Sequence, residues 1–254
     1  MSKKGDLQGR TIVFTGQPKS EEALLEVKRL GGDSVVFPLI RTQEVTLQDE
    51  LFINKLHTYE WLIFTSQNAV VAFEQKLARH GIRIDTLLNK IAAVGSKTSR
   101  ALERIGFQVT FMPTMFSADA FVQQFPLVAG HSDSCLFLRG SLAKATIKEG
   151  LSQNVDEWTV YETLPDLTNA KSLSEYLNVH PNVIVAFASP SSVEVFAREI
   201  APKTDWNELT IAAIGHITAS ALKKQGAPVH IMPTTYTWLA VVQEIANWKD
   251  EKLK

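Results

Sequence analysis

The segment IAAVGSKTSRALERIGFQVTFMP, residues 91–113, returns later in the chain as IAAIGHITASALKKQGAPVHIMP, residues 211–233. The offset is 120 positions (211 − 91 = 120), and the match extends without a gap from 91–126 onto 211–246, where 15 of 36 aligned pairs are identical. FTSQNAVVAF likewise resembles FASPSSVEVF at an offset of 123 (187 − 64 = 123). A repeat of this length is domain-sized, since solenoid repeats span roughly 20–50 residues. The sequence therefore predicts two similar domains.

Short apolar runs alternate with helical stretches in both copies. The runs are continuously apolar rather than alternating, which is typical of strands covered on both faces of a sheet. The β-α-β-α order predicts an α/β fold in which helices flank mostly parallel sheets. The expected strands are 11–16, 33–40, 61–66, 90–95, 109–113, 134–140, 157–162, 182–189, 210–215 and 228–233. Two extended stretches at equivalent places, PLIRTQEV (38–45) and VYETLPDL (160–167), are the expected connections between the domains.

Composition excludes several classes of function. A net charge of −1 does not favour a nucleic-acid binder, which needs a basic face. We expect no membrane span, because no apolar run approaches about 18 residues. The single cysteine, Cys135, indicates a reducing compartment, so a cytoplasmic protein is expected. A monomer is expected because the sequence shows no long apolar surface stripe. The six histidines have no metal-ligand spacing, and the chain has neither a phosphate-binding loop nor a nucleophile motif. We therefore expect no metal and no nucleotide.

Several predicted strands end in small polar or glycine residues that at once open a helix. In a parallel sheet these ends share one edge, and the free N–H groups of the helices that follow favour anions. The simpler interpretation of each Ser, Thr or Asn is helix capping alone, and it stays open. Tyr161 lies in one connecting stretch, where packing is the alternative to a role in chemistry. The candidate residues at the strand ends are Thr15, Ser66, Gln67, Asn68, Gly95, Ser96, Thr98, Arg139, Gly140, Ser189, Ser191, Gly215, His216 and Thr218.

Seven segments, taken in order, resemble the uroporphyrinogen-III synthase family over roughly residues 8–246. They are FPLIRTQEV, WLIFTSQNAV, IAAVGSKTSRALERIGFQV, FLRG, TVYET, FASPSSVEVF and IAAIGHITASALKKQG. The resemblance implies one discontinuous domain, 1–40 plus 166–254, and one continuous domain, 45–160. Two strand-like linkers near 38–45 and 160–167 would join them and permit hinge motion.

The resemblance also implies a reaction. The family closes the linear tetrapyrrole hydroxymethylbilane into a macrocycle, with loss of water and inversion of the last pyrrole ring, in heme biosynthesis. No cofactor is implied. The substrate carries eight carboxylates, which suits a site rich in hydrogen-bond donors. The enzyme that makes hydroxymethylbilane is a candidate partner.

Residue by residue, the resemblance implies that Tyr161 is the catalytic group. It also implies that small polar residues line the substrate site: Ser66, Thr98, Ser189, Ser191 and Thr218. The chain departs from the family pattern at Thr15-Gly16, where many members have Thr-Arg, and at His216-Ile217, where many have Pro-Thr. Two alternatives remain: a non-enzymatic hinge protein of the same fold that binds a small anion, and a two-domain sugar-phosphate enzyme.

Overall fold

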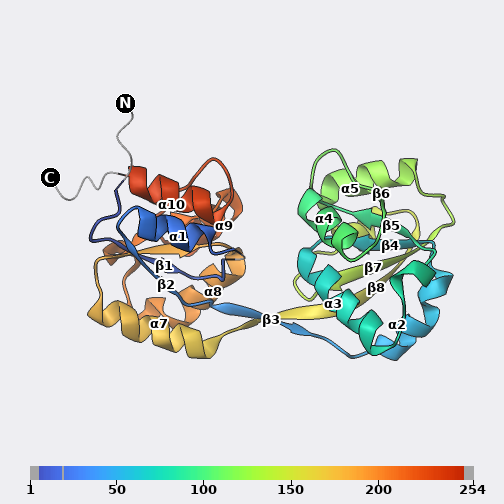
Figure 1. Ribbon diagram of the computed structural model, residues 1–254, viewed down its shortest axis with the longest axis horizontal. Coiled ribbons are helices and arrows are strands. Elements are labelled where there is room, and N and C mark those ends of the chain that lie inside the picture. The colour runs from blue at the N-terminus through green and yellow to red at the C-terminus, as the bar shows by residue number, and fades with distance from the viewer. Residues whose placement is uncertain (1–5, 19, 249–254) are drawn as a thin grey trace. The chain divides into compact units, whose positions relative to one another are not determined.

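The computed structural model describes residues 6–18 and 20–248, which form two compact α/β units (Figure 1). Unit 1 is discontinuous and takes the chain up to Arg41 and again from Leu164, whereas unit 2 is the single stretch Thr42–Thr163. Helices flank a mostly parallel sheet in each unit, which confirms the predicted fold class. The ends of the expected discontinuous domain, 1–5 and 249–254, lie outside the described residues.

Unit 1 has a four-stranded parallel sheet in the order β10-β9-β1-β2. Its central strands are buried on both faces, because Val13 and Val185 enter one apolar cluster while Ile12 and Ile184 enter another. The elements are β1 (Thr11–Phe14), α1 (Glu22–Arg29), β2 (Asp33–Val36), α7 (Leu167–Val179), β9 (Val183–Phe187), α8 (Pro190–Glu199), β10 (Thr210–Ala213), α9 (His216–Lys224) and α10 (Trp238–Asn247), with short 3-10 turns at Ala201–Lys203 and Trp206–Glu208.

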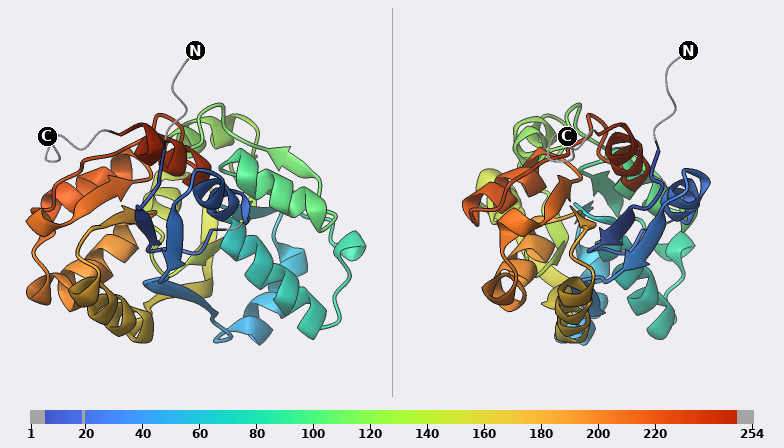
Figure 2. Two further views of the ribbon diagram at one scale, coloured as in Figure 1. Left: turned by 60° about the vertical axis from the view of Figure 1, so that its left-hand side comes forward. Right: turned by 90° about the vertical axis from the view of Figure 1, so that its left-hand side faces the viewer.

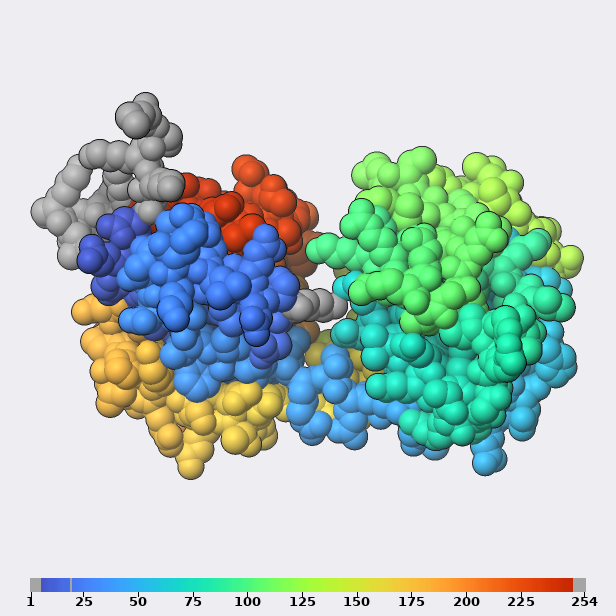
Figure 3. All heavy atoms as spheres, viewed as in Figure 1, coloured from blue at the N-terminus to red at the C-terminus, as the bar shows by residue number. Residues whose placement is uncertain are grey.

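Two helix layers cover this sheet. Helices α1 and α10 lie side by side on one face, where Val27, Val241 and Ile245 belong to one apolar cluster, although the helices come from opposite ends of the chain (Figure 1, Figure 2). Helices α7, α8 and α9 cover the other face. The space-filling view shows α1 in blue with α10 in red above it and α7 in gold below (Figure 3).

Unit 2 has a six-stranded sheet in the order β3-β8-β7-β4-β5-β6. Alternate residues of β4 enter opposite apolar clusters: Leu62 and Phe64 face α2, α3 and α4, whereas Trp61 and Ile63 face α5 and α6. The elements are β3 (Ile40–Glu44), α2 (Asp49–Lys55), β4 (Trp61–Phe64), α3 (Gln67–Arg79), β5 (Lys90–Ala93), α4 (Ser96–Arg104), β6 (Val109–Phe111), α5 (Ala118–Gln124), β7 (Ser134–Gly140), α6 (Thr146–Gly150) and β8 (Asn154–Pro165), with 3-10 turns at Leu56–Thr58, Ile84–Thr86 and Phe125–Leu127.

The chain passes between the units along β3 and β8, which are neighbours in the sheet. The N–H of Asp166 donates to the carbonyl of Leu39 (2.8 Å), and the N–H of Val45 donates to the carbonyl of Val160 (3.1 Å). The partners' numbers run in opposite directions, so this pair is antiparallel.

A buried lysine holds the far end of β3 in unit 2. The ammonium of Lys76 has no exposed surface, donates to the carbonyl of Val45 (2.5 Å) and to Oδ1 of Asp49 (2.7 Å), and lies 3.1 Å from Oε1 of Glu44. Arg79 completes the cluster through the same two carboxylates. Burial alone would raise the pKa of the Glu44 carboxyl, but the hydrogen bonds from Arg79 and Lys76 hold it below its ordinary value.

The prediction of a strand at 228–233 is wrong. The stretch 228–233 forms only an isolated parallel bridge, between Ile231 and Ala212, and is otherwise irregular. Its counterpart in the first copy, 109–113, does contain a strand, β6, although the register of β6 against β5 shifts within that short pairing. The stretch in the second copy has a proline at each end, Pro228 and Pro233, and proline fixes φ and cannot donate to a ladder. Pro228 stands where the first copy has Gln108, so the second copy lacks a backbone N–H at the start of this stretch.

Candidate functional site

In unit 2 the predicted strand-end residues gather at the carboxyl edge of β4, β5 and β7. Ser66 takes an extended conformation after β4 and caps α3, where its hydroxyl accepts the N–H of Ala69 (3.1 Å). The next residue, Gln67, reaches the neighbouring turn and donates to the carbonyl of Lys97 (3.3 Å). The turns after β4 and β5 are thus tied together, and Asn68 stands half-buried beside them.

Tyr161 lies on β8 and points its phenol into the same edge. Its hydroxyl is 3.1 Å from the hydroxyl of Ser66, and either group can be the donor. The ring passes directly over Gly140: a Cβ there would lie 2.6 Å from the phenol oxygen, so the ring would have to move. Glycine at the end of β7 is therefore what allows the phenol to approach Ser66. The structure brings these three predicted residues together.

Arg139 has other partners. Its guanidinium pairs with Oε1 of Glu157 (2.5 Å) and donates to the carbonyls of Gly140 (3.3 Å) and Ala143. These contacts hold the turn after β7 against β8, so Arg139 positions Gly140 within its own unit.

Helices α4 and α9, which belong to the opening repeat, both have glycine at the N-cap position. Gly95 and Gly215 have extended conformations, with φ of −147° and −173°. Since glycine has no side chain to accept a hydrogen bond, the first N–H groups of these helices stay available to solvent or a ligand. Partial positive charge collects at such helix starts. The two copies therefore present the same kind of turn, a glycine N-cap without a side-chain cap.

The remaining predicted residues differ in exposure. In unit 1, Ser189 caps α8 through the N–H of Ser192 (3.2 Å), and Ser191 is half-buried. The hydroxyl of Thr15 is buried and donates to the carbonyl of Ala186 (2.9 Å), so it binds β1 to β9. Thr98 in α4 and Thr218 in α9 are also buried, whereas Ser96 is half-buried.

Sequence reasoning missed an aromatic residue beside each glycine turn. A Cβ at Gly215 would lie 2.9 Å from the ring of Tyr236, and one at Gly95 would lie 3.6 Å from Cβ of Phe116. Both rings are about half exposed, 48% for Tyr236 and 58% for Phe116. The two residues are repeat partners (236 − 116 = 120). An aromatic residue kept at this position in both copies was the signal that could have found them.

His216 is exposed and pairs with Tyr236. Its Nδ1 lies 3.0 Å from the phenol oxygen, and the ring centroids are 5.4 Å apart. In the described residues no group of three or more His, Cys, Asp or Glu side chains could hold a metal ion. Over the same part of the chain, no helix has the length and apolar character to cross a membrane.

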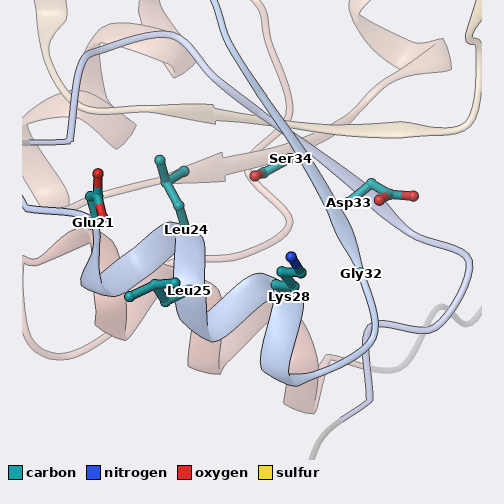
Figure 4. A pocket seen from close by; sticks show the side chains of 7 residues that line it. All are labelled: Glu21, Leu24, Leu25, Lys28, Gly32, Asp33 and Ser34. Carbon is teal, nitrogen blue, oxygen red and sulfur yellow. The ribbon is translucent and has the colours of Figure 1, made fainter.

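A pocket of about 420 Å³ lies elsewhere, along α1 and the start of β2 (Figure 4). Glu21 is the N-cap residue of the helix and Lys28 lies within it, whereas Asp33 and Ser34 come from the strand. It contains none of the predicted strand-end residues and takes no part in the site.

Fold and site together define a two-unit α/β protein whose parallel sheets end in serine, threonine and glycine turns suited to anionic groups. A family model described as uroporphyrinogen-III synthase HemD matches residues 21–243, so the chain belongs to the uroporphyrinogen-III synthase family. This confirms the family and the function in tetrapyrrole biosynthesis that the sequence predicted.

Individual relatives agree. The chain is 30% identical to a uroporphyrinogen-III synthase of Chlorobaculum parvum, over 94% of this chain and 98% of that protein. It is 29% identical to one of Synechococcus elongatus, over 95% and 96%. A mutant uroporphyrinogen III synthase of Thermus thermophilus has the same fold, with a TM-score of 0.69 at 19% identity over 94% and 98% of the two chains.

Proposed function

We propose that this chain is a lyase that cyclises hydroxymethylbilane to uroporphyrinogen III, with loss of one water and inversion of the terminal pyrrole ring. Family membership supports the reaction. The observation that carries the assignment of the site is the 3.1 Å pairing of Tyr161 with Ser66 at a sheet edge rich in N–H donors.

Tyr161 is the proposed acid. Ser66 already accepts the N–H of Ala69, and its own hydrogen can point to the phenol oxygen. That arrangement leaves the phenol proton of Tyr161 for the substrate. As the C–O bond of the hydroxymethyl group breaks, the departing hydroxide takes this proton and leaves as water. Inversion then requires two new C–C bonds and one broken bond: the cation bonds first to the terminal-ring carbon that already carries the bridge, and that bridge bond breaks. The freed bridge carbon bonds to the unsubstituted ring carbon, whose hydrogen is lost as a proton and restores the phenol.

Backbone and hydroxyl donors would hold the substrate carboxylates. The N–H groups that open α4 and α9, after Gly95 and Gly215, suit carboxylates without a basic patch. Ser96, Gln67 and Asn68 stand beside the first of these turns. A chain of net charge −1 can bind a polyanion in this way, because helix N-termini add positive potential locally.

Positioning is the harder part of the task. The electron-rich pyrrole already stabilises the cation left by loss of water, so closure at the correct ring carbon determines the product. Several fixed contacts to carboxylates would fold the linear substrate into the productive geometry. The partner proposed for the chain is the enzyme that makes hydroxymethylbilane, since that product closes spontaneously when it is free.

The test is to supply freshly generated hydroxymethylbilane and separate isomers I and III of the product. Isomer III is expected. Isomer I alone, which forms without any enzyme, would refute the proposal and would favour a non-catalytic anion-binding protein of this fold.

A further inference from the structure

Tyr236 and His216 form a polar pair at one strand-end turn of unit 1. The phenol oxygen lies 3.0 Å from Nδ1 of the imidazole. Both side chains are exposed, the tyrosine at 48%. Tyr236 is nevertheless held in place: the N–H of Thr237 donates to the carbonyl of Thr235 (2.9 Å), and Thr237 caps α10 through the N–H of Ala240 (3.2 Å). A fixed backbone on both sides makes this phenol a preorganised group.

The tyrosine ring lies against the turn that opens α9. A Cβ at Gly215 would come within 2.9 Å of two ring atoms of Tyr236, so any larger residue would displace the ring. The phenol is therefore fixed beside the first N–H groups of α9, at the carboxyl edge of β10.

The first copy of the repeat contains the same arrangement without the polar atoms. Phe116 packs on Gly95 as Tyr236 packs on Gly215, and Ser117 caps α5 as Thr237 caps α10. Phenylalanine satisfies the packing there, so the ring alone does not account for a hydroxyl in the second copy. Ser96 stands where the second copy has His216, and the phenol and the imidazole therefore occur together.

The hydrogen-bonding capacity of the pair determines what it can bind. If the Nδ1–H of His216 donates to the phenol oxygen, the phenol proton of Tyr236 is free to donate outward. An anionic ligand selects this arrangement, because a carboxylate only accepts hydrogen bonds. The result is a chain of two donors that ends on the ligand, and such charge-assisted bonds are about twice as strong as neutral ones.

We infer that Tyr236, oriented by His216, is a further substrate-positioning residue that donates its phenol hydrogen bond to a carboxylate of the linear tetrapyrrole. This inference rests on the function proposed above. It makes the two copies of the repeat unequal: the turn at Gly95 has backbone and serine donors, and the turn at Gly215 adds a phenol.

Steady-state kinetics of Tyr236→Phe with hydroxymethylbilane test this role. Loss of one hydrogen bond to a charged group should raise KM about tenfold, while kcat changes less than about twofold, because the reacting atoms are handled by other residues. His216→Ala should raise KM as well. The double variant should be little worse than Tyr236→Phe, since the imidazole acts through the phenol.

Unit 1 offers a matched control in a second tyrosine–histidine contact. The rings of Tyr176 and His180 lie 4.2 Å apart near the end of α7. Tyr176→Phe should leave KM unchanged. Thermal unfolding of Tyr236→Phe within about 2 °C of the wild type would show that the fold is intact. An unchanged KM in Tyr236→Phe would overturn the inference, and so would equal losses in both tyrosine variants. Wild-type protein that forms only isomer I would instead refute the proposed function.

Discussion

The hydroxyl oxygens of Ser66 and Tyr161 lie 3.1 Å apart, although 95 positions separate the two residues in the chain. Ser66 lies between the end of β4 and the start of α3, and β8 places the phenol of Tyr161 over Gly140 at the end of β7. The pairing thus depends on three strands of one sheet. It is the best-defined polar contact of the proposed reaction centre.

Tyr161→Phe should lower kcat for hydroxymethylbilane by about 10- to 100-fold without abolishing turnover, at or below the lower end of general-acid effects. Positioning by the remaining contacts would sustain the residual rate. Tyr59→Phe is the matched control: Tyr59 is buried and donates to Oδ2 of Asp156 (2.7 Å), so its loss should lower the melting temperature and leave kcat nearly unchanged. Wild-type kcat in Tyr161→Phe would remove the phenol from the mechanism.

Gly140→Ala should reproduce most of the kinetic defect of Tyr161→Phe while Tyr161 is still present. The new Cβ would lie 2.6 Å from the phenol oxygen and must push the ring away from Ser66. Overpacking of this kind typically costs about 1–3 kcal/mol of stability. The measurement is kcat in the single variants and in the pair: adding Gly140→Ala to Tyr161→Phe should cost little more activity. If the kcat losses of Gly140→Ala and Tyr161→Phe multiplied in the double variant, the glycine would affect catalysis independently of Tyr161.

Lys76→Met should destabilise unit 2 strongly. Removal of the ammonium leaves the carboxylates of Asp49 and Glu44 without their buried partner, and breaking such a pair typically costs about 3–5 kcal/mol. Lys55 at the end of α2 is exposed, so Lys55→Met is the control and should be close to neutral. Urea unfolding measures both. Equal midpoints for the two variants would argue against the anchoring role of Lys76.

The same cluster should make the protein sensitive to acid. The pKa of Glu44 is held below its ordinary value of about 4.3, so the folded state favours the charged carboxylate. Its stabilisation is therefore present above about pH 4.3 and is lost as the pH falls through the lower, folded-state pKa. Unfolding free energy measured from pH 6 to pH 3 should fall less steeply in Glu44→Gln than in the wild type. Glu50→Gln, on the exposed side of α2, should keep the wild-type slope.

Cys135 should resist thiol reagents in the native state. The thiol is buried in β7, and burial, helped by the carboxylates of Asp133 and Glu60, raises its pKa to about 12. Since the thiolate is the reactive form, labelling by iodoacetamide at pH 8 should follow unfolding. Rapid labelling of the folded protein, without added denaturant, would contradict the placement of this side chain.

Much of the fold was readable from the sequence because buried parallel strands carry a simple signal. The runs at 61–64 and 183–187 are apolar throughout, and both faces of each strand are covered by helices. The gapless repeat identified equivalent elements in the two copies. The stretch 228–233 shows the limit of that signal: the same apolar pattern gave a strand in one copy and a single bridge in the other.

The partners within the site could not be read in this way. Whether Arg139 faces a ligand depends on its contact with Glu157 across the β7–β8 pairing, and sequence spacing does not give that register. The side chain of Thr15 is buried because its hydroxyl donates a hydrogen bond to the carbonyl of Ala186 on the neighbouring strand. Tyr236 escaped notice because its partner, His216, lies 20 positions away at a different turn.

Product analysis with freshly generated hydroxymethylbilane tests the central claim most directly. The wild-type protein should give predominantly uroporphyrinogen III, at a rate well above the spontaneous closure measured without protein. Tyr161→Phe should still give isomer III, but more slowly and with more isomer I from the competing uncatalysed reaction. Isomer I alone from the wild-type protein, at the spontaneous rate, would contradict the account.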